Sequence, residues 1–283
     1  MQTIPRNTVI TIILLLCLGG WLAWQKWSAS TEPKPPLLTQ IKNRGALVAG
    51  IRFDAKPFGY LDADGTVKGY DIDLIREIAT RLLGSPDAVE FRQVLASTRV
   101  IALNSGNLDI VAATMTITPQ REDYIDFSDV YYEAGQAVIV PANNTVQTIA
   151  DLQDKTLLYV MGTTGEKTIK QTLPTAKFLG FKTNMDAFSA LIAGRGDAMT
   201  TDDTMLSGLI KDRCDFTMLP QRLSKEPYGL GIRQNEPNHN TQSFRQTINQ
   251  LLADMKQDGT LDKLQAKWLG PTTNVCHSRE GDL

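Results

Sequence analysis

Apolar residues in the first half of the chain switch repeatedly between short continuous runs and helical spacing. Ile72, Ile75 and Ile78 share one face of a predicted amphipathic helix over 71–84, which ends at Gly84. The elements expected around it are strands over 46–53, 89–94 and 108–117, a hairpin around 64–65 and a short helix over 97–106. Strands that alternate with helices in this way favour a mainly parallel sheet covered on both faces.

The same alternation resumes after residue 144, with a helix, a strand, a turn and a helix within 148–174, and predicts a second unit. Its expected strands are 177–181, 197–202 and 226–232, its helices are 184–196 and 203–211, and two closing helices fall within 241–270. Strand-like crossings near 137–141 and 228–232 would connect the two units, leaving a cleft and a hinge between them. We therefore expect an α/β chain with lobe 1 over 43–137 and 231–270, and lobe 2 over 138–230.

The N-terminal residues 1–30 form a separate region. An apolar run from Val9 to Trp24 follows a positive charge at Arg6. The run is long for the core of a signal peptide and short for a spanning helix, so a cleaved export signal and an uncleaved membrane anchor both stay open. Either one places the globular part at the periplasmic or extracytoplasmic face. Residues 31–42 are expected to be a linker and 271–283 a C-terminal tail.

The composition is that of an ordinary globular protein, with 42% hydrophobic residues, 21% charged residues and a formal net charge of −2. No basic patch is visible in the sequence, which argues against nucleic acid as a partner. The two histidines, His239 and His277, and three widely separated cysteines provide no local spacing for a metal site. We therefore expect neither a metal nor a cofactor.

Cysteine usage suggests one disulfide. Cys17 lies inside the N-terminal apolar segment, which leaves Cys214 and Cys276 in the globular part and its tail. In an oxidising compartment two such cysteines usually pair, and the bridge would tie the tail to the second lobe. Two unpaired thiols are the alternative.

Six stretches in a fixed order resemble a known family and together cover about residues 43–270. They are GIRFDAKPFGY, GYDIDLIREIA, DIVAATMTITPQREDYIDFSDVYY, GTTGE, GRGDAMTTDD and DGTLDKLQAKWLG. The chain resembles the extracytoplasmic solute-binding proteins of amino-acid ABC transporters, in the branch for polar amino acids. The resemblance implies a two-lobed periplasmic-binding-protein fold of type II, with the ligand cleft between lobes joined by two hinge strands. It also implies a monomer that works with a membrane permease.

A row of threonines leads to a single arginine. Thr114, Thr116 and Thr118 alternate ahead of Pro119, so in a strand their hydroxyls would share a face, with Arg121 just beyond. The resemblance implies that Arg121 forms a bidentate pair with the ligand's α-carboxylate. It further implies that Thr116 gives a hydroxyl and an N–H to the same carboxylate, and that the Thr114 carbonyl faces the ammonium. The alternative is an arginine paired on the surface with the acidic residues that follow it.

Two more motifs belong to the second lobe. Asp202 and Asp203 follow a predicted strand and precede a helix; the resemblance implies that Asp203 binds the ammonium, while one of the two could cap the helix instead. The GTTGEKT stretch at 162–168 lacks the glycine spacing of a phosphate loop, and predicts a helix N-terminus that favours an anionic group. There Thr164 matches a contact to the carboxylate, with a plain helix cap as the alternative.

Arg52 and Arg99 bear on side-chain specificity. The resemblance implies that Arg52 holds a distal carboxylate and that Arg99 is a second arginine of the glutamate- and aspartate-binding branch. Three arginines facing one acid would leave excess positive charge, which a dicarboxylic ligand would neutralise. Ala96 and Asn184 depart from the branch pattern, which has a hydroxyl or aromatic group and a histidine at these positions.

The expected function is therefore capture of a polar amino acid and its delivery to an ABC transporter permease. Glutamate or aspartate is the first expectation, and glutamine or asparagine the next. Two other classes stay open: a sensor ectodomain anchored by its N-terminal segment, and a dehydratase or lyase on the same fold. An enzyme would need a positioned acid or base, whereas this motif set matches amine binding.

Overall fold

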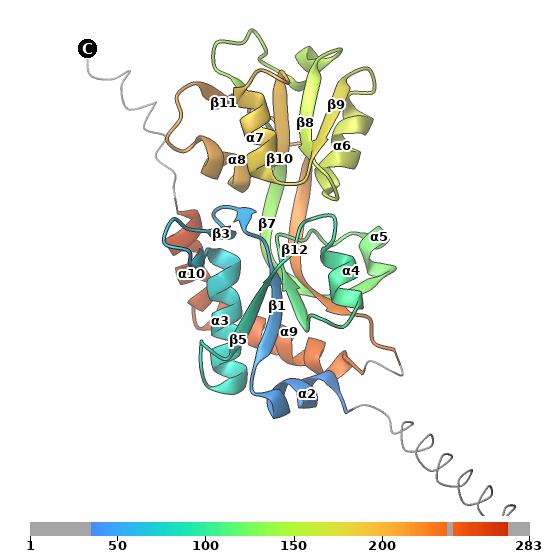
Figure 1. Cartoon of the computed structure of the whole chain (residues 1–283), viewed down its shortest axis with the longest axis vertical. Coiled ribbons are helices and arrows are strands. Elements are labelled where there is room, and N and C mark those ends of the chain that lie inside the picture. The colour runs from blue at the N-terminus through green and yellow to red at the C-terminus, as the bar shows by residue number, and fades with distance from the viewer. Residues whose placement is uncertain (1–34, 237–239, 271–283) are drawn as a thin grey trace, which may run out of the picture. The chain divides into compact units, whose positions relative to one another are not determined.

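The structure, a computed structural model, describes residues 35–236 and 240–270. The compact unit that begins at Pro36 contains two lobes of strands and helices (Figure 1). This is the mixed α/β two-lobe architecture that the sequence predicts. No helix in the described part of the chain is long and apolar enough to cross a membrane. The N-terminal region and the C-terminal tail of the sequence prediction lie outside the described residues.

The first lobe is built on parallel strands, because β1 (Leu47–Ile51) pairs in parallel with both β5 (Val89–Gln93) and β6 (Ile110–Ala112). A small antiparallel sheet contains the predicted hairpin and has Gly65 at its turn with φ 78°. The strands of that sheet are β2 (Asp54–Ala55), β3 (Gly59–Leu61) and β4 (Val67–Lys68). The helices of the lobe are α2 (Leu37–Arg44), α3 (Tyr70–Leu83), α4 (Arg99–Asn104), α5 (Pro119–Glu122), α9 (Gln242–Gln257) and α10 (Thr260–Leu269).

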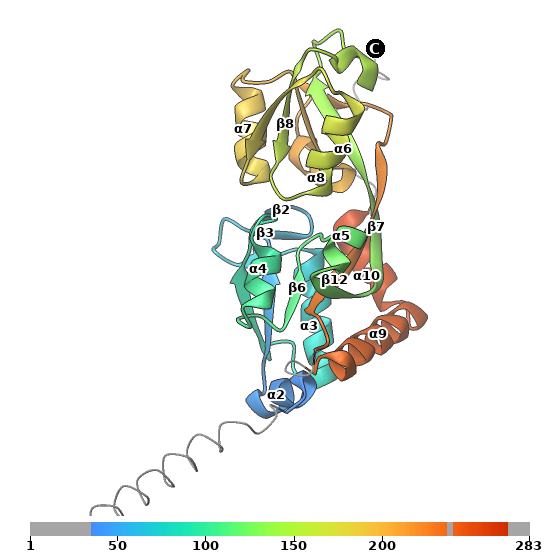
Figure 2. The same ribbon diagram turned by 90° about the vertical axis from the view of Figure 1, so that its right-hand side faces the viewer.

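The second lobe, like the first, consists of strands with helices packed beside them (Figure 2). Its strands are β8 (Thr156–Val160), β9 (Lys177–Phe181), β10 (Ala198–Asp202) and β11 (Phe216–Met218). Its helices are α6 (Thr164–Thr172), α7 (Asn184–Ile192) and α8 (Asp203–Ile210), with the 3-10 helix η2 at Ile149–Leu152. Pairing runs through both lobes in the order β5-β1-β6-β12-β7-β10-β8-β9, with β11 paired to β7.

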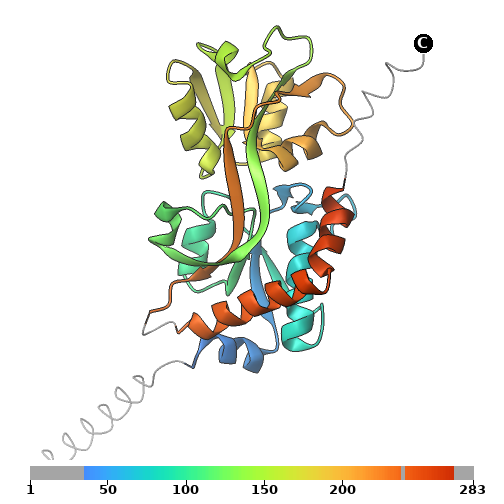
Figure 3. The same cartoon turned by 180° about the vertical axis from the view of Figure 1, so that it is seen from behind.

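Two long strands, β7 (Ile125–Pro141) and β12 (Ser224–Arg233), run side by side between the lobes (Figure 3). On β7, Ala134 belongs to a core cluster of the first lobe and Ala137 to one of the second. Around the start of β12 the change of lobe occurs between Leu223, which precedes the strand, and Tyr228. The chain therefore crosses near 135–136 and 224–227. Our expected crossings lie later on both strands, where Val138 and Leu230 are buried inside opposite lobes.

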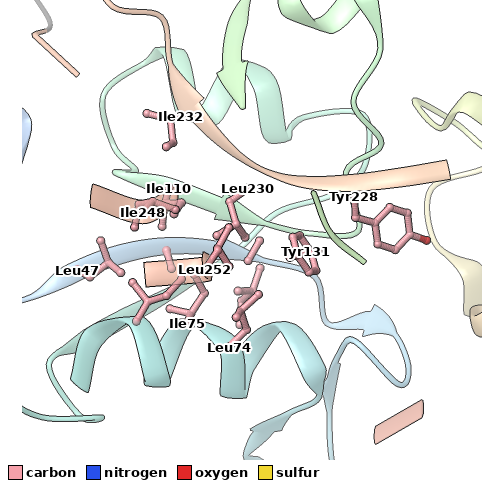
Figure 4. Close-up of a cluster of buried hydrophobic side chains, with 14 of the residues drawn as sticks. Leu47, Leu74, Ile75, Ile110, Tyr131, Tyr228, Leu230, Ile232, Ile248 and Leu252 are labelled. Atoms are coloured by element: carbon pink, nitrogen blue, oxygen red, sulfur yellow. The ribbon is translucent and has the colours of Figure 1, made fainter. Parts of the chain in front are cut away.

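Alternating strand residues enter cores on opposite faces of the sheet, as strand geometry requires. In the first lobe, Ala49 packs in the cluster that contains α3, whereas Val48 packs in the cluster on the other face. The same alternation separates Ile139 from Val138 in the second lobe. Figure 4 shows the largest of these clusters, between β1, β12, α3 and α9. Each fully buried leucine or isoleucine contributes about 1.5–3 kcal/mol, so these clusters stabilise the two lobes that carry the site.

Candidate functional site

A small buried cavity lies where the two lobes meet. Its volume is about 10 Å³, roughly the space of one water molecule. Residues from both lobes line it, and they include all the predicted ligand-binding residues except Asp203, which makes six of the seven. The lining residues are Arg52, Arg99, Thr114, Thr116, Arg121, Thr163, Thr164, Asp202 and Met205.

Arg121 is positioned by a capped turn of helix. Thr118 is the N-cap of α5 and its hydroxyl accepts a hydrogen bond from the Arg121 N–H at 3.3 Å, while Pro119 fits the first helical position because it needs no donor there. The guanidinium then donates to the Thr116 carbonyl at 2.6 Å and, across the cleft, to the Gly162 carbonyl at 3.2 Å. Arg121 therefore points into the cleft, which excludes the alternative of a surface ion pair with the acids that follow it.

The sequence predicts that the three threonines share one strand face. The structure shows that they do not. Strand β6 ends at Ala112, and Thr114 adopts φ 48°, a left-handed conformation that is costly for a β-branched residue. Buried Asp71 holds this turn by accepting a hydrogen bond from the Thr114 N–H at 3.1 Å. The Tyr131 hydroxyl donates to the other oxygen of Asp71 at 2.8 Å. The sequence marked Asp71 only as the start of a helix, so its support of Thr114 was missed.

Arg99 is the first residue of α4 and is fully buried. It donates to the carbonyls of Ala113 and Thr114, and its Nε has no hydrogen-bond partner within the described residues. Burial lowers the pKa of Arg99 well below its ordinary value, and the charges of Arg121 and Arg52 lower it further. Within the described residues, neither Arg99 nor Arg121 forms an ion pair with a carboxylate. This end of the cavity is therefore suited to an anion.

Arg52 is different, because it already has a carboxylate partner. Its guanidinium donates to both oxygens of Asp54, at 2.9 and 2.6 Å. Burial would raise the pKa of Asp54, but the Arg52 charge and hydrogen bonds to it keep that pKa below its ordinary value. Our charge count omitted Asp54, although residues two apart on an extended segment share a face. The excess positive charge that favoured a dicarboxylic ligand is therefore absent at Arg52.

Asn184 closes the same end from the second lobe. Its backbone N–H donates to the Asp54 carboxylate at 2.9 Å, and its side-chain amide donates to the Asp54 carbonyl at 3.2 Å and to the Met205 sulfur at 3.2 Å. The Asn184 side-chain oxygen is buried without a hydrogen-bond partner among the described residues. Met205 and Asn184 also line an adjoining hollow of about 420 Å³. A ligand side chain at this end would meet amide and carboxylate groups.

The two acids at the strand-to-helix junction, Asp202 at the end of β10 and Asp203 at the start of α8, do not lie as the sequence predicts. Asp202, not Asp203, lines the cavity, and it accepts a hydrogen bond from the buried Tyr228 hydroxyl. Burial raises the pKa of Asp202 to about 7. Asp203 instead faces away, where it accepts from the Thr204 N–H at 2.7 Å and pairs with Arg222 at 3.0 Å. Adjacent residues at a strand-to-helix junction point in different directions, and the sequence alone did not decide which one faces inward.

Thr164 reaches the cleft from the first turn of α6. Its hydroxyl donates to Glu226 at 2.7 Å, and the N-cap of the helix is Thr163, so Thr164 is not a plain cap. Thr116 donates to the same Glu226 oxygen, also at 2.7 Å. Glu226 was missed because it opens an apolar strand motif and no spacing rule connects it with either threonine.

The remaining predictions concern cysteines and metals. Cys214 is disulfide-bonded. Cys276 lies outside the described residues, as do His239 and His277, so the Cys214–Cys276 pairing stays a prediction. Among the described residues there is no group of His, Cys, Asp and Glu that could hold a metal ion.

Comparison with known proteins identifies the family. Residues 47–271 match the bacterial extracellular solute-binding proteins, family 3. The chain belongs to this family. The family is extracellular, in agreement with the expected extracytoplasmic location, whereas an N-terminal membrane anchor stays a prediction.

Individual relatives of this family 3 protein cover most of its length. The ABC transporter glutamine-binding protein GlnH of Bacillus subtilis (strain 168) is 33% identical over 264 residues, which are 93% of this chain and 94% of that protein. The glutamine-binding protein of Geobacillus stearothermophilus is 37% identical over 214 residues, 75% of this chain and 82% of that protein. The solved structure of an ancestral arginine-binding protein bound to glutamine has a TM-score of 0.74 and 36% identity, and covers 80% of this chain and 99% of its own. These relatives do not confirm the glutamate- and aspartate-binding branch.

Proposed function

We propose that this protein is the receptor of an ABC transporter, which closes its lobes around a polar L-amino acid and delivers it to the membrane permease. The observation that carries the proposal is the pairing of opposite charges in one cavity. Arg99 and Arg121 lack carboxylate partners within the described residues, and Asp202 is a buried acid beside them. A guanidinium pair suits an α-carboxylate, and a buried carboxylate suits an α-ammonium.

We infer further that the preferred ligand has a neutral carboxamide side chain, with glutamine as the best candidate. Arg52 is neutralised by Asp54, so a second ligand carboxylate would lie near an occupied guanidinium and a like charge. A carboxamide N–H could instead donate to the unpartnered oxygen of Asn184. The glutamine-binding names of two relatives support this choice over the acidic ligands that the sequence first suggested.

In this arrangement of the lobes the cavity, about 10 Å³, is too small for an amino acid, so we infer that the lobes open for the ligand to enter. The crossings near 135–136 and 224–227 provide the hinge for such an opening. Delivery to a permease follows from the family and from the ABC transporter name of one relative. The relatives are named as binding proteins, which supports a receptor over an enzyme.

A thermal-shift screen of the purified protein tests this proposal. The panel contains the twenty common amino acids, together with glutaramate, which is glutamine without the ammonium, and 4-aminobutanamide, which is glutamine without the α-carboxylate. A ligand that binds only the folded state stabilises it by RT ln(1 + [L]/Kd), about 2.7 kcal/mol at 100 times Kd.

We expect L-glutamine to give the largest shift, with the two one-ended compounds giving none. A larger shift from glutamate or aspartate would restore the acidic-ligand assignment. A shift from glutaramate equal to that from glutamine would remove the role proposed for Asp202. The absence of a shift from every amino acid would count against the receptor function itself.

A further inference from the structure

A groove of about 430 Å³ lies between the lobes and shares no lining residue with the cavity of the candidate site. Lobe 1 lines it with Lys56 and the end of α10, and lobe 2 lines it with α8 through Lys211. The lobes are in direct contact beside it, because a Cβ added to Gly208 of α8 would lie 2.8 Å from the Lys56 carbonyl oxygen. The groove therefore spans a boundary that separates when the lobes open.

The last described residue, Gly270, is itself part of this groove. It follows α10, whose end is fixed to lobe 1. The Trp268 indole N–H donates to Asp73 of α3 at 2.8 Å, and the centroid of its ring lies 6.3 Å from that of Tyr60. Residues 271–283 come next in the sequence. This C-terminal tail thus begins at a fixed point of lobe 1 inside the groove.

Cys214 belongs to lobe 2 and is close in sequence to the same groove. It follows Lys211, a lining residue, in the connection between α8 and β11, and it is exposed and disulfide-bonded. The other cysteines of the chain are Cys17 and Cys276. Both lie outside the described residues, so the bridge joins Cys214 to one of these two segments.

Reach favours Cys276 as the partner. It is six residues beyond Gly270, a segment that spans about 20 Å when fully extended, so the path from Gly270 has to run along the groove toward lobe 2. Cys17 lies 20 residues before α2, which is at the end of lobe 1 remote from lobe 2 (Figures 1 and 2). A bridge to Cys17 would have to bring that segment past the whole of lobe 1.

The charges suit this path as well. Lys56 and Lys211 line the groove from opposite lobes, and neither forms an ion pair with a described residue. The tail carries two acids, Glu280 and Asp282, against the single Arg279. Opposite charges of this kind fix the register of a docked segment more than they add affinity.

We propose that residues 271–276 form a strap across this groove, closed by a Cys214–Cys276 disulfide, which limits how far the lobes open. The inference goes beyond the proposed function and rests only on the opening that this function requires. Strands β7 and β12 already connect the lobes, and the strap is a third connection at the groove. Because a short tether permits a narrower range of separations than a loose chain end, the strap favours the closed arrangement in the absence of ligand.

Mapping of the bridge is the first test. The full chain is digested without reduction, and mass spectrometry identifies the peptide joined to Cys214. We expect the Cys276 peptide in the wild-type protein and in Cys17→Ser, and loss of the bridged peptide in Cys276→Ser. A bridge from Cys214 to Cys17, or between two molecules, would overturn the strap.

Small-angle scattering of the ligand-free protein then measures the opening. A dithiol reductant gives the bridge two electrons and two protons, so that two thiols form and the reductant becomes a disulfide. We expect reduction to raise the radius of gyration of the wild-type protein and of Cys17→Ser. Cys276→Ser should have the larger value with or without reductant. An unchanged radius of gyration on reduction of the wild-type protein would show that the bridge does not limit opening.

A longer strap separates the length of the tether from the bond itself. An insertion of about ten Gly and Ser residues after Gly270 keeps both cysteines and adds about 33 Å of reach. We expect this variant to keep the bridge and yet match the larger radius of gyration of Cys276→Ser. The same insertion after Asn143, in an exposed turn of lobe 2, is the matched control and should respond to reductant as the wild-type protein does. If the variant with the longer strap is as compact as the oxidised wild-type protein, the reach of the tail is not what limits opening.

Amine labelling reports on the groove directly. Without reductant, Lys56 and Lys211 should react more slowly in the wild-type protein than in Cys276→Ser. Lys155 and Lys182, exposed residues of lobe 2 outside the groove, should react equally in both. Equal labelling of Lys56 and Lys211 in the two proteins would mean that the tail does not lie in the groove. Cooperative melting confirms that each variant is folded, and no ligand enters these measurements, so the strap and the receptor function can fail separately.

Discussion

The two ends of the cavity carry the same type of side chain in different surroundings. At one end the Arg52 guanidinium is held by both oxygens of Asp54, at 2.9 and 2.6 Å. At the other end Arg99 and Arg121 donate to backbone carbonyls and have no carboxylate partner within the described residues. The first arginine forms a direct ion pair before any ligand arrives, whereas the charges of Asp202 and Glu226 act on the other two without such a pair. A count of arginines therefore overestimates the positive charge that a ligand meets.

The largest expected effect comes from removing the unpaired end. Arg121→Ala should weaken every amino-acid ligand at least about a hundredfold, because a charge-assisted contact to the α-carboxylate of roughly 3 kcal/mol is lost. Calorimetry with glutamine, glutamate and asparagine measures this. Arg92→Ala is the matched control, since Arg92 is 44% exposed and pairs with Glu90 on the surface. A variant that loses one ligand but keeps the others would show that Arg121 contacts the side chain instead.

The next effect is a pH dependence set by Asp202. Burial raises the pKa of this carboxyl to about 7, so it holds a proton at lower pH, whereas a ligand ammonium needs its ionised form. Affinity should be constant above pH 7 and fall about tenfold per pH unit below it, reaching a hundredfold loss near pH 5. The charged groups that act on Asp202 include the acids Glu226 and Asp203 and the arginines Arg52, Arg99 and Arg121.

Calorimetry of glutamine binding from pH 5 to pH 8 checks this dependence. Asp202→Asn should bind weakly with a flat profile, because the proton-linked step is removed. Asp203→Asn should retain the fall in affinity at low pH but move it to lower pH, since Asp203 pairs with Arg222 outside the cavity while its charge raises the pKa of Asp202. A flat profile in the wild-type protein would refute the role of Asp202.

A smaller change should convert the neutral end into a cationic one. Asp54→Asn removes the partner of Arg52 and should shift the ratio of glutamate to glutamine affinity toward glutamate by about tenfold. The matched control is Asp215→Asn, because Asp215 forms a similar two-point pair with Arg213 away from the site. An unchanged ratio in the Asp54 variant would mean that the ligand side chain does not reach Arg52.

The smallest effect concerns the turn that presents Arg121. Thr118→Ala deletes the cap of α5 and should cost about 1 kcal/mol of stability, a fall in Tm of about 2–4 °C. Affinity should fall about threefold because Arg121 is held less well. Thr148→Ala removes a similar cap from η2 and should lower Tm without affecting affinity. Equal affinities in the two variants would show that the cap does not position the arginine.

The features that the sequence predicted correctly depend on local pattern. The spacing of Ile72, Ile75 and Ile78 identified a helix that the structure has at Tyr70–Leu83, and its end at Gly84 has φ 84°. The continuous apolar run in β1 identified a strand buried on both faces. Periodicity and caps are properties of neighbouring residues, so they can be read without knowing the rest of the fold.

The features that the sequence did not predict depend on contacts between distant segments. Thr114 leaves the strand conformation because Asp71, 43 positions earlier, accepts its N–H. Glu226 meets Thr116 across 110 positions, and no periodicity connects them. Asp202 and Asp203 are neighbours in the sequence, but only Asp202 lines the cavity, while Asp203 pairs with Arg222. Each of these decides the chemistry of the site, and each needs the folded backbone to be seen.

The most direct test of the account compares L-glutamine and L-glutamate on the wild-type protein at pH 8, by calorimetry under identical conditions. Our proposal is that the cavity binds a zwitterionic amino acid with a neutral side chain, because Arg52 is already paired with Asp54. It predicts that glutamine binds at least about tenfold more tightly than glutamate, since the acid would bring an uncompensated charge to that end. Glutamate binding as tightly as glutamine, or more tightly, would contradict it.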